Sequence, residues 1–244
     1  MRYRHLTWAA ALLTAGVASA DVTIVASWPS PAEKPYGIAY DGSYVWVSSD
    51  ATGNEMMYQC EPTSGSVVSS FGVTTTGLMG CCHDGTYLWY DALDSTLNYY
   101  MHQVTDTGSV LTSWQSPLAR TVGCGWDGQY LWLSSYYSVL GWATTSGSLV
   151  GSFGTGWRPT GVTFDGYYLW TAEYHQPDLY RLTTAGSVVA SYLFPAGEPW
   201  GLGFDGEYLW VTSVGTPAYV YRVDFGGYPS VAPASLGRVR AMFR

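Results

Sequence analysis

The stretch Asp41-Gly-Ser-Tyr-Val-Trp46 is the first of five near-copies of one phrase, Asp-Gly-x-Tyr-(Leu or Val)-Trp. The other copies read DGTYLW from Asp84, DGQYLW from Asp127, DGYYLW from Asp165 and DGEYLW from Asp205. Successive aspartates are 43, 43, 38 and 40 residues apart. A fixed period of about 40 residues indicates a chain built from repeated structural units.

Each copy of the phrase predicts a tight β-hairpin. Asp-Gly suits a two-residue type I′ turn, because both residues tolerate positive φ and apolar residues flank the pair. The Tyr and Trp that follow alternate with Val or Leu, which predicts a strand whose Tyr and Trp both lie between neighbouring units. A glycine precedes every aspartate by four residues, at Gly37, Gly80, Gly123, Gly161 and Gly201. Bulky and small residues alternate after it, as in an innermost strand.

Two further strands complete each repeat, and the last of them is typified by SVVSSF from Ser66. The fifth repeat lacks this last strand. At the other end of the chain, however, TIVASW from Thr23 matches SVVASY from Ser187. We therefore expect an all-β fold, a five-bladed β-propeller of four-stranded antiparallel blades. Its ring is closed by the N-terminal strand at residues 22–28, which completes the last blade.

The two ends of the chain fall outside the repeats. Residues 1–20 have the basic start, the apolar stretch and the Ala18-Ser19-Ala20 cleavage site of a signal peptide. The predicted organisation is a signal peptide at 1–20, a propeller at 21–227, and a linker with a basic tail at 228–244. We expect an exported bacterial protein, secreted or held in the periplasm or cell envelope, with no transmembrane segment in the mature chain.

Composition excludes one class of partner. The formal net charge is -8, and loss of Arg2 and Arg4 with the signal peptide would make it more negative still. Nucleic-acid binding depends on a basic surface, so nucleic acid is not expected as a partner. The 12 Trp and 21 Tyr suit a monomer whose blades are packed on both faces by aromatic rings.

The pattern Gly-x-x-(aromatic)-Asp-Gly-x-Tyr-Leu-Trp resembles the blade phrase of secreted bacterial β-propellers. These are related to the NHL, SMP-30/gluconolactonase and glutamine-cyclotransferase-like propellers. The resemblance covers Val22 to about Gly226 and implies the blade but no particular activity, since the group contains enzymes as well as other propellers. Plant-type glutaminyl cyclases are similar in having five blades. Their F-T-Q-G-L-(E) phrase is absent here, where the nearest segments read PYGIAYDG and PWGLGFDG.

A discrete site is expected where the five repeats differ. In this architecture the loops entering the innermost strands share a face with the loops joining the second and third strands, and such loops carry function. The residues predicted to bind a ligand there are aromatic or cationic: Tyr36, Arg120, Tyr136, Arg158, Tyr174 and Trp200. They favour a non-catalytic binding or display module for a small molecule, glycan or protein partner.

Two alternatives of a different class stay open. The first is a propeller enzyme, a hydrolase or lyase acting on a sugar or acyl-type substrate through Glu173, His175 or Glu198. It would need a deep pocket at the channel mouth where these groups converge. The second is a structural component of a cell-envelope assembly, with the Arg-rich tail as its tether.

No cofactor is predicted, although two groups of loop oxygens are of the kind that Ca²⁺ takes. One group is Asp50 with Asn54 and Glu55, and the other is Asp91 with Asp94. Residues of these types are also common turn formers. Their presence in loops is therefore better explained by turn formation than by a Ca²⁺ site.

The four cysteines leave several pairings open. An exported chain favours disulfides. Strand alternation would bring Cys82 and Cys124 together between the second and third blades, leaving Cys60 to pair with Cys81. A vicinal Cys81–Cys82 bridge and four free buried thiols are the alternatives, since the Cα separations decide between them.

Overall fold

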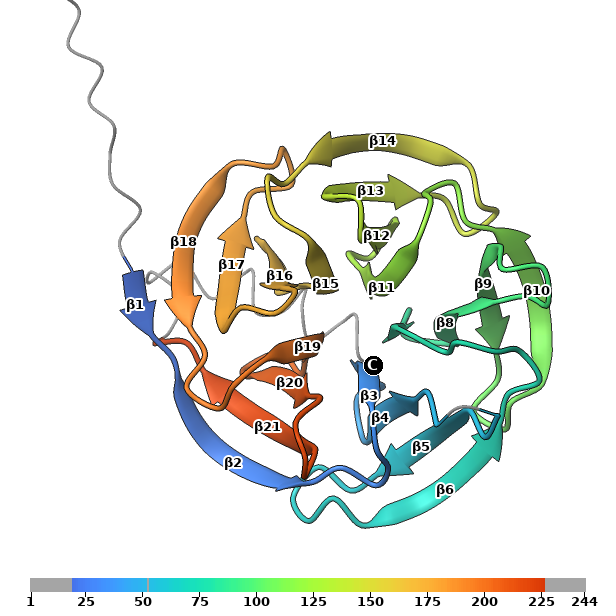
Figure 1. The fold of residues 1–244 in the computed structure, drawn as a ribbon, viewed down its shortest axis with the longest axis horizontal. Coiled ribbons are helices and arrows are strands. Elements are labelled where there is room, and N and C mark those ends of the chain that lie inside the picture. Colours follow the sequence, from blue (N-terminus) through green and yellow to red (C-terminus); the bar gives the residue numbers. More distant parts are fainter. Residues whose placement is uncertain (1–18, 52, 227–244) are drawn as a thin grey trace, which may run out of the picture.

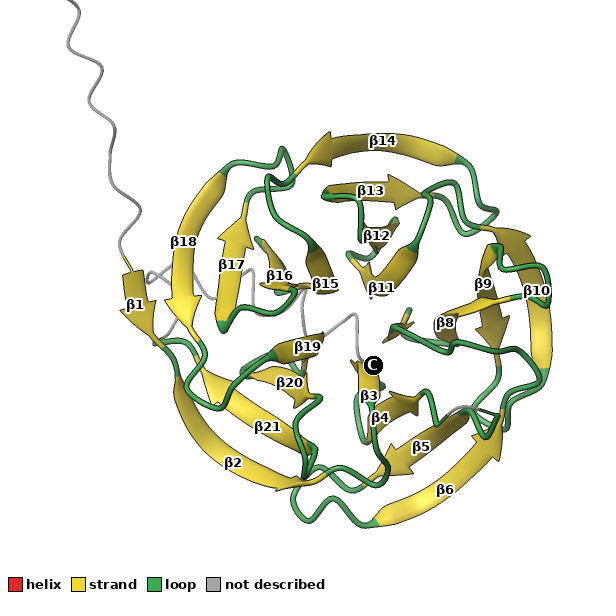
Figure 2. Ribbon diagram, in the orientation of Figure 1, coloured by secondary structure: helices red, strands yellow, loops and turns green. Residues whose placement is uncertain are grey.

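The computed structural model of the chain describes residues 19–51 and 53–226, which form a ring of five blades around a central axis (Figure 1). Each blade is an antiparallel sheet of four strands. The described residues contain strands and loops but no helix, so none of them forms a helix that could cross a membrane (Figure 2). The predicted all-β, five-bladed propeller is confirmed.

The strands of each blade follow one another from the axis outward. The innermost strands are β3 (Pro35–Tyr40), β7 (Cys81–His83), β11 (Thr121–Trp126), β15 (Pro159–Phe164) and β19 (Pro199–Phe204). The second strands are β4 (Val45–Ser49), β8 (Leu88–Leu93), β12 (Leu131–Ser135), β16 (Leu169–Glu173) and β20 (Leu209–Ser213). The third strands are β5 (Met56–Cys60), β9 (Tyr99–Val104), β13 (Val139–Ala143), β17 (Asp178–Leu182) and β21 (Tyr219–Asp224).

The outer strands show how the ring closes. In blades 1 to 4 they are β6 (Val67–Gly72), β10 (Val110–Gln115), β14 (Leu149–Gly154) and β18 (Val188–Leu193). In blade 5 the outer strand is β2 (Thr23–Pro29), which pairs with β21 from Thr23 opposite Asp224 to Pro29 opposite Tyr219. The N-terminal strand therefore completes the last blade, as the match between TIVASW and SVVASY predicts.

A further strand, β1 (Ser19–Asp21), lies parallel to β18 on the outer edge of blade 4. The repeat pattern gives no sign of it, because it falls before the first repeat. Ser19 and Ala20 belong to the segment predicted as a signal peptide. The rest of that segment, and the predicted basic tail at 228–244, lie outside the described residues.

The hydrophobic core lies between the blades. The Trp of each phrase is almost wholly buried there; Trp46, for example, packs in one cluster with Ala39 of its own blade and Cys81 of the next. The Tyr of each phrase is instead partly exposed, with 36% of Tyr87 accessible. The expectation that Tyr and Trp are both covered was therefore wrong for Tyr, which lies beside the turn where the neighbouring blade no longer reaches it.

The conserved spacing inside the phrase has a direct structural cause. The indole Nε1 of Trp46 donates to Asp41 Oδ2 over 2.7 Å, while Asp41 Oδ1 accepts the backbone N–H groups of Ser43 and Tyr44. The same three hydrogen bonds recur in the other four blades. The aspartate thus ties its own turn to the tryptophan between the blades.

The turn itself differs from the type I′ prediction. Gly42 has a φ of 102°, and the glycine of every other copy is also positive, but none of the five aspartates is. The aspartate therefore precedes the two central turn residues and closes the turn with its side chain, as Asx turns do. Glycine is needed in the next position because only it adopts this φ at no steric cost.

Five glycines bring the blades together at the axis. A Cβ atom on Gly161 would lie 2.5 Å from the backbone oxygen of Trp200 and 3.0 Å from the carbonyl carbon of Gly201. Corresponding backbone contacts link the five in a closed ring, in the order Gly37, Gly80, Gly123, Gly161, Gly201 and back to Gly37. The innermost strands therefore touch through their backbones, which explains the glycine four residues before each aspartate.

Candidate binding face

The connections of each blade alternate between two faces of the ring, because its strands are antiparallel. The Asp-Gly turns lie on one, which we call the turn face. The loops entering the innermost strands and those joining the second and third strands lie on the other, the loop face. Function is expected on the loop face, where the five repeats differ in sequence.

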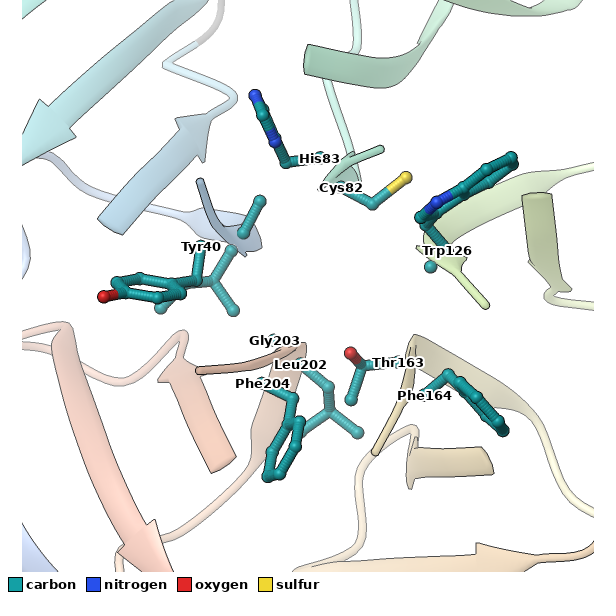
Figure 3. A pocket seen from close by; sticks show the side chains of 12 residues that line it. Tyr40, Cys82, His83, Trp126, Thr163, Phe164, Leu202, Gly203 and Phe204 are labelled. Atoms are coloured by element: carbon teal, nitrogen blue, oxygen red, sulfur yellow. The ribbon is translucent and has the colours of Figure 1, made fainter. Parts of the chain in front are cut away.

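The cavities on the two faces differ in size. Around the axis on the turn side lies a cavity of about 30 Å³, lined by all five innermost strands and including Cys82, His83 and Trp126 (Figure 3). It has room for about one water molecule. Three cavities on the loop face are larger, at about 280, 390 and 530 Å³, and each lies between a loop of one blade and the loop that enters the next.

Four aromatic rings form a continuous row on the loop face, which we call the aromatic arc: Tyr36, Trp200, Tyr174 and Tyr136. Their centroids are 4.6 Å apart for Tyr36 and Trp200, 5.4 Å for Trp200 and Tyr174, and 4.7 Å for Tyr174 and Tyr136. The arc thus joins blades 1, 5, 4 and 3. The three tyrosines are partly exposed, whereas Trp200 is 8% accessible and supports the arc from below.

Two arginines extend the arc at its blade 3 end. The guanidinium carbons of Arg120 and Arg158 lie 4.8 and 5.3 Å from the ring centroid of Tyr136. Burial, and then a hydrogen bond with Tyr174, raise the pKa of Tyr136 to about 12, so its hydroxyl stays neutral. The six residues predicted to bind a ligand are therefore brought together, in contact with one another.

The three predicted acid–base residues surround the same region. His175 Nδ1 lies 3.0 Å from Glu198 Oε2, and both side chains are exposed. Glu173 accepts a hydrogen bond of 2.7 Å from the Tyr180 hydroxyl, and it lines the cavity of about 390 Å³ together with His175. His175 has a φ of 59°, a conformation that is costly for residues other than glycine and that often accompanies function.

Tyr180, which positions Glu173, is absent from the sequence-based set. Its ring also stacks on Trp157, with centroids 4.0 Å apart. The same strand position holds Tyr58 and Tyr221 in other blades, so nothing in the pattern distinguishes it. Tyr180 is distinguished by its two partners, Trp157 of the loop that enters blade 4 and Glu173 at the end of β16.

Of the residues considered for Ca²⁺, Asp50 and Glu55 lie together: burial raises the pKa of Asp50, as do the charge of Glu55 and a hydrogen bond with it. Asp91 and Asp94 do not gather. Asp91 was expected in a loop but lies within β8, fully buried, where Oδ1 accepts the Gly80 N–H over 2.9 Å and Oδ2 has no hydrogen-bond partner. Asp94 is partly exposed and accepts hydrogen bonds from Thr96 and Asn98 of its own turn. Residues 19–51 and 53–226 contain no group of three His, Cys, Asp or Glu side chains placed to hold a metal ion.

All four cysteines are free and buried. Cys82 and Cys124 pack in one cluster between blades 2 and 3, as strand alternation predicts. Cys60 packs between blades 5 and 1, whereas Cys81 packs between blades 1 and 2. The Cys60–Cys81 pairing was therefore wrong, because blade 1 separates the two thiols. Cys81 and Cys82 point to different clusters, so a vicinal bridge is not formed either.

Solved structures similar to this one are also propellers. A glutaminyl cyclase from Myxococcus xanthus aligns with a TM-score of 0.67 at 13% identity, over 83% of this chain and 95% of its own. The PQQ-bound form of an aldose sugar dehydrogenase from Streptomyces coelicolor aligns with a TM-score of 0.56 at 11% identity, over 84% of this chain and 98% of its own. BamB from Moraxella catarrhalis aligns with a TM-score of 0.43 at 9% identity, over 87% of this chain and 100% of its own.

Comparison of the sequence alone gives no match. No family model matches the chain, and no curated protein matches it. At such low identity the structural likeness to the first two proteins concerns the fold alone. The chain therefore shares the propeller architecture with proteins of unlike activity, and its function has to be argued from its own loop face.

Proposed function

We propose that the protein is a non-catalytic carbohydrate-binding propeller whose site is the aromatic arc of the loop face. The observation that carries this proposal is the contact between successive rings, which gathers the partly exposed tyrosines of blades 1, 4 and 3 around the buried Trp200 of blade 5. A pyranose ring has an apolar C–H face and a polar rim. It therefore matches a tyrosine, which offers an apolar face and a hydroxyl at its edge.

The spread of the partly exposed tyrosines over blades 1, 4 and 3 supports an extended ligand. The glycine ring draws the innermost strands into backbone contact, and the cavity around the axis on the turn side, about 30 Å³, is too small for a sugar. The larger cavities of the loop face lie between the loops of adjacent blades. Small-molecule sites usually enclose most of their ligand in a pocket. A row of partly exposed rings suits an oligosaccharide that lies across the surface.

A catalytic role is the second candidate, favoured by the 3.0 Å contact between His175 and Glu198 next to Glu173. Two carboxyl groups flanking a bond are what glycoside hydrolysis requires. Both partners of the contact are exposed, however, and Glu173 is engaged by Tyr180. Release of reducing sugar from a bound oligosaccharide, abolished by Glu198→Gln, would establish this second function in place of the first.

The binding proposal is tested on a glycan array, followed by titration of the best-bound oligosaccharide. Tyr174→Ala is expected to weaken binding about tenfold, since stacking contacts contribute on the order of 1 kcal/mol. Tyr87→Ala is the matched control, because it removes a partly exposed tyrosine from the turn face. If the folded wild-type protein binds no glycan on the array, the proposal is wrong.

Export, attachment and oligomeric state are further parts of the proposal. We infer that the chain is processed after Ala20 and acts as a monomer outside the cytoplasm, free or attached to the envelope. The intact mass of protein recovered from the secreting host identifies the cleaved bond, and size-exclusion chromatography gives the oligomeric state. Retention of residues 1–20 in the recovered protein would contradict the export signal.

A further inference from the structure

Basic residues are scarce in this protein, and most of those described lie near acids. The described chain contains five Lys and Arg residues. Arg222 pairs with Asp205 over 3.2 Å, Arg181 interacts with Asp165, and Lys34 with Asp50. Such pairing is expected in a chain whose formal net charge is -8.

Arg120 and Arg158 are the exceptions. Within the part of the chain that the structure describes, no carboxylate oxygen lies within 4.0 Å of either guanidinium group. Both side chains are exposed. Two unpaired cations therefore stand together on an otherwise acidic protein, and both come from loops that enter an innermost strand.

Tyrosines hold these two arginines in place. Both guanidinium groups lie over the ring of Tyr136, within 4.8 and 5.3 Å of its centroid. The guanidinium group of Arg120 also lies over the ring of Tyr137, 5.8 Å from its centroid. A guanidinium group has five N–H donors in a fixed fork. The tyrosines thus orient the fork while leaving donors that a ligand can use.

The chemistry of an oriented arginine pair indicates an anion. Arginine binds carboxylate and other oxyanions through two parallel hydrogen bonds, and such bonds are about twice as strong as neutral ones. The pair adjoins Tyr136, the last ring of the aromatic arc, so an anion held there would be carried by a ligand that continues along the rings.

We propose that Arg120 and Arg158 bind the acidic groups of an anionic glycan, either uronate carboxylates or sulfate esters, whose sugar rings lie along the aromatic arc. This inference rests on the proposed carbohydrate-binding function and narrows its ligand class. Acidic and neutral glycans of the same backbone are distinguished by the arginines, whereas the arc contacts both.

The test uses three probes with the full-length mature protein in isothermal titration: hexagalacturonate, its fully methyl-esterified and hence uncharged form, and a sulfated galactan hexasaccharide. The wild type is expected to bind at least one acidic probe at least tenfold more tightly than the neutral ester, with an affinity that falls as salt rises. Preference between the two acidic probes identifies the source of the anion.

Variants separate charge from geometry. Arg120→Gln and Arg158→Gln are each expected to weaken binding of the acidic probe about tenfold and to leave binding of the ester unchanged. Arg120→Lys keeps the charge but loses the fork, so it should recover only part of the affinity. Lys34→Gln, which removes a charge from the loop face away from Tyr136, is the matched control. Circular dichroism verifies the fold of each variant.

The outcomes are distinct. Equal affinity for the acidic probes and the ester, or wild-type affinity in the double variant Arg120→Gln/Arg158→Gln, would overturn the anionic class while leaving carbohydrate binding intact. Failure of all three probes to bind would overturn the anionic class. If the protein also binds no glycan on the array, the proposed carbohydrate-binding function is overturned too.

Discussion

The turn face and the loop face are built from different residue types and serve different ends. On the turn face, five copies of one phrase place Asp, Gly and Trp in the same hydrogen bonds each time. On the loop face, the residue at a given repeat position changes around the ring: the position that holds Arg120 and Arg158 in blades 3 and 4 holds Lys34, Gly77 and Glu198 in the others. Repetition therefore marks what every blade needs in order to fold. Difference marks the residues that packing leaves free to bind.

The largest expected effect comes from the axis, where the blades meet. In Gly161→Ala the new Cβ would lie 2.5 Å from Trp200 O and 2.6 Å from Leu202 N, both backbone atoms that cannot rotate away. We expect a loss of at least about 4 kcal/mol, or failure to fold. In Gly154→Ala the nearest atom is Ser138 O at 3.8 Å, so that control should stay within about 0.5 kcal/mol in urea denaturation.

The aspartates of the two faces provide the next contrast. Asp165 is buried and accepts hydrogen bonds from Trp170 Nε1 and from the backbone of Tyr167 and Tyr168. Asp165→Ala leaves these donors without an acceptor, and we expect a loss of about 3 kcal/mol. Asp94→Ala removes a similar turn aspartate from the exposed loop face. A Tm for Asp165→Ala as high as that for Asp94→Ala would contradict the role of the Asp–Trp contact.

A pH effect is expected where one blade departs from the others. Asp91 occupies the position of Ser48 and Ser134, and burial raises its pKa to about 8 from the ordinary 3.8. The unfolded chain loses this proton near pH 4 while the folded chain keeps it. The contribution of the neutral carboxyl is therefore complete below about pH 4, and it declines as pH rises towards 8.

Asp91→Ser introduces the hydroxyl that Ser48, Ser134 and Thr212 place at this position in three other blades, and it removes this dependence. At pH 8 we expect the variant to be more stable than the wild type by about 1 to 3 kcal/mol, the cost of a buried group without a partner. Near pH 4 the difference should vanish. Urea denaturation at pH 4, 6 and 8 measures the difference, and a constant gap across this range would show that Asp91 is ionised in the folded state.

The smallest expected effect lies on the loop face. His175 has a φ of 59°, which glycine adopts more readily. His175→Gly should leave the stability unchanged or raise it by about 0.5 kcal/mol, although the contact with Glu198 is lost. A loss above about 1 kcal/mol in thermal denaturation would mean that this pair serves the fold after all.

Blade number, strand order and ring closure follow from the sequence because the phrase repeats. Every copy supplies the same evidence, so an error in one blade is corrected by the other four. The type I′ turn was wrong because Asp-Gly alone does not reveal that the aspartate bonds to Trp five residues later, although the constant spacing contains that information. Asp91 was misplaced because an aspartate between two strand-like segments looks like a turn former.

The loop face was predictable in part. The face itself follows from strand alternation, and the six residues proposed to bind there are indeed in contact. Neither the order of the rings in the arc nor the support given by Tyr180 to Glu173 was predictable, since both depend on how loops from different blades meet. The Cys60–Cys81 pairing failed for a different reason. It required knowing which side of blade 1 each side chain faces.

The pairing of β2 with β21 has a consequence for how the chain reaches its native state. Thr23, near the start of the chain, lies opposite Asp224, near the end of the described residues. The last blade therefore cannot assemble until almost the whole chain has been delivered, and contacts so distant in sequence form slowly. The export proposed for this chain would gain from this order, since the first strand has no partner until the last one arrives.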